Sequence, residues 1–216
     1  MRIDKVILKA VLSTLLAILV LCGVMVTALV FLYPSTLMEI SYNVGMDSAS
    51  AWFADRAYNQ SDNIYYIGYA TEVAIGAKDP EPEAIEKYGE KFIADEQFPK
   101  YCAEMDESSA EEGLTGSYAQ YIYGQVYAAK YRLGKKTEAV EAAFAVNRDG
   151  FPRNNAVVAV LFAAMDDGHG GDIETMGLLL EGMQELKTQA TDFPAEDLDY
   201  LNALINLTAE RMDELS

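Results

Sequence analysis

The residues best suited to chemistry lie in one short segment, residues 166–172, which reads Asp-Asp-Gly-His-Gly-Gly-Asp. His169 is the only histidine of the chain. One imidazole among carboxylates is a partial ligand set for a metal ion. The segment lacks the alternating acids and final glutamate of a calcium loop, and it has no second histidine or cysteine for zinc. We therefore predict no metal site, and we interpret the segment as a glycine-rich turn in which Asp172 caps the next helix.

Catalysis by a nucleophile has no supporting motif either. The chain contains no Gly-x-Ser-x-Gly elbow, no phosphate-binding loop and no dinucleotide fingerprint. Cys102 and His169 are not accompanied by any motif that would pair them. We predict that the chain is not an enzyme, with no catalytic residue and no cofactor. A metal-dependent enzyme built around His169 is kept as the last alternative.

Tyrosine is the residue type whose placement suggests binding. Eleven of the fourteen tyrosines lie between Tyr58 and Tyr131. Tyrosines four residues apart share one helix face, and such rings offer contact area together with hydroxyls for hydrogen bonding. In the alternative interpretation the rings cover the core and only the hydroxyls reach water. The candidate binding surface consists of Tyr65, Tyr66, Tyr69, Tyr118, Tyr121, Tyr123, Tyr127 and Tyr131.

The elements that carry these residues read as helices, because apolar side chains recur at helical spacing and strand patterns are nearly absent. Asp79 and Pro80 are expected to cap and begin one of them. Residues 104–113 are acidic and contain serine, which indicates a loop. Residues 156–165 are almost wholly apolar, which indicates a helix buried on all sides. We expect about nine helices, near 48–58, 63–77, 80–94, 96–105, 117–133, 138–147, 155–165, 172–187 and 195–214.

One turn sequence recurs along these helices. Residues 134–140 (Gly-Lys-Lys-Thr-Glu-Ala-Val) return as residues 170–176 (Gly-Gly-Asp-Ile-Glu-Thr-Met) and, more loosely, as residues 76–85. In each copy a helix stops at glycine and the next begins with glutamate, a small residue and an apolar residue. Such a unit, repeated at a period of 20–50 residues, indicates stacked helix hairpins.

This turn resembles that of the tetratricopeptide repeat, whose units carry Gly-x-x-x-Glu-Ala-Ile/Val between two helices. Gly134, Glu138, Ala139 and Val140 match it best, and the resemblance covers about residues 63–186. It implies an all-α domain of stacked antiparallel hairpins, an α-solenoid, with a concave surface that binds peptides or proteins. It carries no catalytic residue. An irregular helical bundle is the alternative.

Residues 10–33 form an uncharged, apolar run at the start of the chain. As a helix they would reach about 36 Å, which is enough to cross a hydrocarbon core of about 30 Å. Arg2, Lys5 and Lys9 precede the run, and the first charge after it is Glu39. This arrangement predicts a cytoplasmic N-terminus and an exported C-terminal part.

Three interpretations of this run are open. The favoured one is a permanent signal anchor, with Tyr33 in the interfacial aromatic belt and Pro34 ending the helix. The second is a cleaved secretory signal, for which residues 26–28 (Val-Thr-Ala) offer a cleavage site. The third is a lipoprotein signal with the lipid on Cys22, although Leu21 stands where a small residue is wanted.

Charge bounds the partners of the exported part. Beyond the run it holds 13 Lys and Arg against 33 Asp and Glu, a net charge of −20. Such a surface as a whole repels nucleic acid and anionic headgroups, so we expect no nucleic-acid partner. It attracts cationic peptides, basic proteins or divalent cations, or it serves solubility alone. Cys102 is the only cysteine outside the run, so no disulfide forms within the domain, which fits a bacterial envelope.

The sequence therefore predicts four regions: a cytoplasmic N-terminus (1–9), a single-pass transmembrane anchor (10–33), a juxtamembrane connector (34–47) and an extracytoplasmic helical domain (48–216). We expect a non-catalytic protein- or peptide-binding module, or scaffold, on the outer face of the cell membrane. The alternative is a structural subunit that contacts its partner through the transmembrane helix, where Ala17, Gly23 and Ala28 would allow close approach.

Overall fold

The computed structural model describes residues 2–111, 116–166 and 171–216. Within them the chain is all-helical, with 81% of residues in eleven helices and no strand. This confirms the predicted all-α class. The chain divides into two compact units, which we call the N-terminal unit (Met1–Val73) and the C-terminal unit (Ala74–Ser216). Helix α4 (Ile64–Gly76) crosses this boundary.

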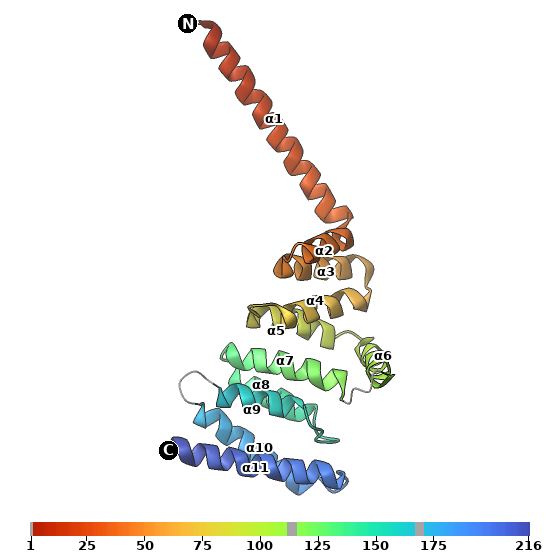
Figure 1. Cartoon of the computed structure of the whole chain (residues 1–216), viewed down its shortest axis with the longest axis vertical. Coiled ribbons are helices and arrows are strands. Elements are labelled where there is room, and N and C mark those ends of the chain that lie inside the picture. The colour runs from red at the N-terminus through yellow and green to blue at the C-terminus, as the bar shows by residue number, and fades with distance from the viewer. Residues whose placement is uncertain (1, 112–115, 167–170) are drawn as a thin grey trace. The chain divides into compact units, whose positions relative to one another are not determined.

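The N-terminal unit begins with one long apolar helix, α1 (Arg2–Leu32), which extends away from the helices that follow it in the same unit (Figure 1). Its segment Ile7–Leu32 contains 26 residues, of which the most apolar stretch of 18 has a mean hydropathy of 3.0 and no buried residue. The helix is long and apolar enough to cross a membrane, as the sequence indicated.

Two shorter helices follow, α2 (Pro34–Asn43) and α3 (Asp47–Ser61), and they pack against each other. Helix α1 ends at Leu32 because Pro34 cannot continue it, and Pro34 instead takes the first position of α2. Most of the expected connector, residues 34–47, is therefore helical. Gly45, with φ of 74°, makes the left-handed turn between the two helices.

Helix α7 makes contacts with more helices of the C-terminal unit than its sequence neighbours alone. Helix α7 contacts α5, α6, α8 and α9, while α10 contacts α8, α9 and α11. The largest fully buried side chains include Phe92, Ile122, Leu161, Met176 and Leu201, which come from five of these helices. The helices are α5 (Pro82–Ile93), α6 (Phe98–Glu111), α7 (Tyr118–Arg132), α8 (Lys136–Ala145), α9 (Ala156–Met165), α10 (Ile173–Gln189) and α11 (Ala195–Leu215).

Side-chain caps fix where several of these helices start. Ser117 accepts a hydrogen bond from the Gln120 amide, and Asn155 accepts one from the Val158 amide. Asp172 caps α10 in the same way, as the sequence predicted, by accepting from the Thr175 amide. The turn after α7 contains Gly134, whose φ of 80° is a conformation that favours glycine.

Three local expectations are corrected. Residues 104–111 of the expected acidic loop are helical, because α6 continues through them, with Lys100 and Glu104 paired along its surface; residues 112–113 of that loop lie outside the described residues. Helix α5 begins at Pro82 rather than Pro80, because a residue before proline is held in an extended conformation, here Glu81. Helix α9 is not buried on all sides, since Phe162 is 54% exposed.

Candidate functional site

Three of the eight candidate tyrosines lie on α4, in the N-terminal unit. Tyr65 is 55% exposed, whereas Tyr66 and Tyr69 are half-buried. The Tyr69 ring lies edge-on to Tyr42 at 6.0 Å, and its hydroxyl shares a 3.1 Å hydrogen bond with the hydroxyl of Ser50. Tyr69 therefore joins α4 to α2 and α3, and Tyr65 is the ring of this group that faces solvent.

The other five tyrosines lie on α7, in the C-terminal unit. Tyr121 is 45% exposed and Tyr118 and Tyr123 are half-buried, but Tyr127 and Tyr131 are only 8% and 5% exposed. The Tyr123 and Tyr127 rings stack at 5.9 Å, and burial raises the pKa of both hydroxyls. Helix α7 therefore does not present a row of exposed rings. The face that carries tyrosines at four-residue spacing packs against neighbouring helices, and Tyr127 and Tyr131 belong to the core.

Charged side chains cross-link the helices of this unit. Lys130, on the buried side of α7, forms ion pairs with Glu90 of α5 at 2.5 Å and with Glu138 of α8. Burial alone would lower the pKa of Lys130, but the hydrogen bonds to Glu138 and Glu90 outweigh it and raise that pKa. Lys135 pairs with Glu86 at 2.6 Å. These pairs hold α5, α7 and α8 together.

A second polar cluster forms around Asp172. Its carboxylate accepts from Lys136 at 2.7 Å, from the Tyr131 hydroxyl at 3.0 Å and from the Thr175 hydroxyl at 2.6 Å. Burial opposes ionisation of Asp172, but the hydrogen bonds from Lys136, Thr175 and Tyr131 outweigh it and lower the pKa to about 2. The carboxylate is saturated by structural contacts.

His169, the centre of the alternative metal site, lies outside the described residues. Within residues 2–111, 116–166 and 171–216, no group of three His, Cys, Asp or Glu side chains is arranged to hold a metal ion. Asp172, one carboxylate of that segment, serves as the helix cap already described.

One concave surface, which we call the acidic groove, lies between α8 and α10. Its volume is about 770 Å³. Apolar side chains, among them Val140, Phe144 and Leu178, form part of its lining, and Leu178 is 40% exposed. One cation, Arg148, lies among four acids. The glutamates of its lining are Glu138, Glu141, Glu181 and Glu185.

A close helix approach shapes this groove. The ring of Phe144 on α8 lies directly against Gly182 on α10, in the space that a Cβ atom at position 182 would occupy. Only glycine allows this contact without displacing the ring. The groove is therefore built by the packing of α8 on α10, and its apolar floor depends on Gly182.

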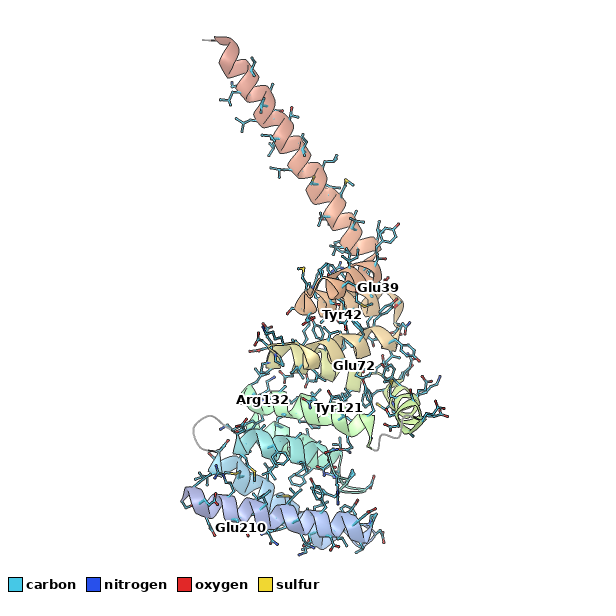
Figure 2. The ribbon with its side chains drawn as sticks, viewed as in Figure 1. Glu39, Tyr42, Glu72, Tyr121, Arg132 and Glu210 are labelled. Atoms are coloured by element: carbon cyan, nitrogen blue, oxygen red, sulfur yellow. The ribbon has the colours of Figure 1, made fainter. Side chains whose placement is uncertain are left out.

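A second concave surface, which we call the basic groove, lies along α7 and α9. Its volume is about 910 Å³, and its lining includes Arg132, Lys136, Arg211 and the exposed ring of Phe162. Tyr121 lies near the start of α7 and Arg132 at its end (Figure 2). Lys136 and Arg211 pair with Asp172 and with the neighbouring Glu214, respectively. Most of the cationic charge here is thus partly neutralised within the chain.

No known family model matches this chain, and comparison with curated proteins and with solved structures finds no significant match.

Sequence reasoning missed the acidic groove, although a signal was present. Glu138 and Glu141 are three residues apart, and Glu181 and Glu185 are four apart, so each pair shares one helix face. What the sequence did not reveal is that α8 and α10 would pack side by side and bring both pairs to one surface.

Proposed function

We propose that this chain is a membrane-anchored, non-catalytic protein-binding module on the extracytoplasmic face of the cell membrane. In this proposal α1 is the anchor and the C-terminal unit, built from tetratricopeptide-like helix hairpins, binds a basic amphipathic segment of a partner protein. The acidic groove is the observation that carries the proposal.

The chemistry of the groove selects this class of partner. Apolar side chains such as Phe144 and Leu178 reward the burial of apolar groups, while the glutamates favour lysine and arginine. Glu138 already pairs with Lys130, so three further glutamates face one arginine in the groove, and the whole chain carries a net charge of −18. A nucleic acid or an acidic peptide would meet repulsion there. A segment with apolar residues on one face and cations on the other fits both features.

Site-specific photo-crosslinking in native membranes tests this proposal. A photoreactive residue replaces Leu178 in the groove, and the control replaces Leu207 on α11, which is 44% exposed. We expect a defined adduct from position 178 and none from position 207. Mass spectrometry should find the crosslinked segment of the partner rich in lysine and arginine. Equal adducts from both positions, or an acidic crosslinked segment, would contradict the proposal.

Charge reversal sharpens the same experiment. Glu141→Lys with Glu181→Lys should lower the yield of the position-178 adduct roughly tenfold, because several favourable ion pairs become repulsive. The control pair, Glu196→Lys with Glu210→Lys on α11, makes the same change of net charge away from the groove. An equal loss in both double variants would show that bulk charge, and not the groove, attracts the partner.

A structural subunit assembled through α1 predicts a different outcome. Replacing residues 10–33 with an unrelated apolar helix of the same length should leave the position-178 adduct unchanged if the groove binds the partner. If the adduct disappears while the chain remains in the membrane, the transmembrane helix makes the essential contact.

A further inference from the structure

Arg56 has an unusual position in both the sequence and the fold. It is the only lysine or arginine between Lys9 and Lys78, a stretch that otherwise carries only acidic charges. The structure places it on α3 at the end of α1, within the N-terminal unit. Its guanidinium lies 3.9 Å from the centre of the Phe31 ring and 5.5 Å from that of the Trp52 ring. The single cation of this region is therefore held where the apolar helix ends.

A hydrogen bond joins the same two helices beside it. Gln60 Nε2 donates to the backbone carbonyl of Phe31 at 2.7 Å. This carbonyl belongs to the last turn of α1, where carbonyl groups lack a partner within the helix. Arg56 also complements the negative end of the α1 dipole. We call Phe31, Trp52, Arg56 and Gln60 the Arg56 cluster.

The cluster leaves hydrogen-bonding capacity unused. The Nε atom of Arg56 is buried and has no hydrogen-bond partner among the described residues, although the residue as a whole is half-buried. A phosphate would therefore contact the outer nitrogens of the guanidinium, and Nε would gain a partner only if the side chain moved. The Arg56 neighbours Phe31 and Trp52 stabilise positive charge through their ring faces, but they do not accept the in-plane hydrogen bonds of a guanidinium. Lys130, Lys135 and Lys136, in contrast, each contact a carboxylate.

The position along α1 indicates what the cluster would meet. The apolar segment Ile7–Leu32 is about 39 Å long at 1.5 Å per residue, so it crosses the hydrocarbon and ends near the headgroups. Phe31 lies at that end. Trp52, 41% exposed, is the residue type that concentrates at the membrane–water interface. The anionic group available at this level is the lipid phosphate, whose geometry suits a guanidinium.

We propose that the Arg56 cluster binds the phosphate of a phospholipid headgroup in the outer leaflet, with the Trp52 ring among the headgroups. This inference rests on the proposed membrane anchoring of α1. It adds a lipid contact that holds α3 at the membrane surface next to the end of the span.

Trp52 makes the inference directly measurable, because it is the only tryptophan of the chain. The full chain is reconstituted in vesicles of phosphatidylcholine and phosphatidylglycerol, with a nitroxide quencher either at the headgroup or deep in the acyl chain. We expect the headgroup quencher to reduce Trp52 fluorescence at least twofold more than the deep quencher. Equal or weaker quenching at the headgroup, or Trp52 as accessible to aqueous iodide as in maltoside micelles, would overturn the inference.

Variants test the role of Arg56. Arg56→Gln removes the charge and should reduce headgroup quenching at least twofold, whereas Arg56→Lys should retain part of it. Arg132→Gln, in the C-terminal unit, is the matched control and should behave as wild type. Headgroup quenching that is unchanged in Arg56→Gln would overturn the role of Arg56. Circular dichroism checks that each variant remains helical. If Arg56→Gln unfolds, Arg56→Met replaces it, because it also removes the charge.

Two controls separate this inference from the anchoring. Flotation of the full chain with vesicles reports whether α1 inserts. If the chain floats but Trp52 is not quenched from the headgroup, the lipid contact is wrong and the anchor stands. If the chain does not float, the proposed anchoring itself fails. In maltoside micelles, inorganic phosphate should change Trp52 fluorescence much less than incorporation into the phospholipid vesicles does. A change as large as the one in vesicles would overturn the assignment to lipid.

Discussion

The hydroxyl of Tyr131 donates a hydrogen bond to Asp172 Oδ2 over 3.0 Å and so joins the last turn of α7 to the first turn of α10. Lys136, in the first turn of α8, reaches the same oxygen at 2.7 Å. One carboxylate thus ties the ends of three helices that border the two grooves. Because Asp172 also caps α10, the ionised state of this side chain matters for both the cap and the inter-helix contacts.

This arrangement predicts an acid-sensitive contribution to stability. The folded-state pKa of Asp172 is about 2, below its ordinary value of 3.8. Its contribution, of about 2 kcal/mol, is therefore fully present above pH 4 and is lost as the pH falls towards 2. Asp172→Asn keeps a cap but cannot form the ion pair. In urea denaturation of the full chain in maltoside micelles, we expect the variant to lose less stability than wild type between pH 4 and pH 2.

Tyr131→Phe is the companion change, because it removes only the hydroxyl. We expect a loss of about 1.5–3 kcal/mol in the free energy of unfolding near neutral pH, typical of one hydrogen bond to a charged partner. Tyr123→Phe, on the same helix, serves as the control and should have a smaller effect, because the Tyr123 hydroxyl forms no hydrogen bond among the described residues. Equal effects of the two changes would contradict the role assigned to Tyr131.

Close packing of α5 on α7 predicts a steric requirement at Gly89. A methyl group at this position would overlap the Val126 side chain, which is completely buried. Gly89→Ala should therefore lower the free energy of unfolding by about 1–3 kcal/mol, despite the better helix propensity of alanine. In a background that carries Val126→Ala, Gly89→Ala should lower the free energy of unfolding by less than it does in the wild type. Gly76→Ala, where no atom lies within 4 Å of the new methyl, is the control and should not destabilise.

The helices themselves were largely predictable from local sequence, because their starts are set by local chemistry. Asp172 caps α10 as its position predicted, and the turn at Gly134 needs the conformation that glycine favours. The start of α5 was misjudged because Pro80 and Pro82 both suit a first turn. The acidic end of α6 was misjudged because polar composition was interpreted as a loop. That stretch also gains a distant contact, since Asp106 accepts a hydrogen bond from the Tyr118 amide.

The candidate surfaces were much less predictable. Four-residue spacing correctly places Tyr123, Tyr127 and Tyr131 on one face of a helix, but it does not reveal whether another helix covers that face. Tyrosine is ambiguous in this respect because it has an apolar ring and a polar tip. The acidic groove depends on α8 packing beside α10, some 40 residues later in the chain, which no local pattern encodes.

The buried Lys130 predicts a dependence of stability on its two carboxylate partners. Lys130→Met should lower the free energy of unfolding by about 2 kcal/mol, because Glu90 and Glu138 lose their shared partner and repel each other. Adding Glu90→Gln and Glu138→Gln should recover much of that loss. Lys100→Met breaks the exposed pair with Glu104 and is expected to have little or no effect. Urea denaturation of these three variants and the wild type in maltoside micelles measures the difference.

The two cysteines make the proposed topology testable by labelling. Burial, with a smaller contribution from the nearby Asp106 charge, raises the pKa of the Cys102 thiol to about 12, so it remains protonated and unreactive. Cys22 lies within the apolar segment of α1. Intact cells making the wild-type chain should therefore show almost no reaction with a membrane-impermeant maleimide.

Ser108→Cys, at an exposed position on α6, should be labelled from outside. A cysteine added before Met1 should be labelled only after the cells are opened. If the N-terminal cysteine is labelled in intact cells and Ser108→Cys is protected, the orientation is opposite to the one proposed. The prediction from the charges that flank α1 would then be wrong.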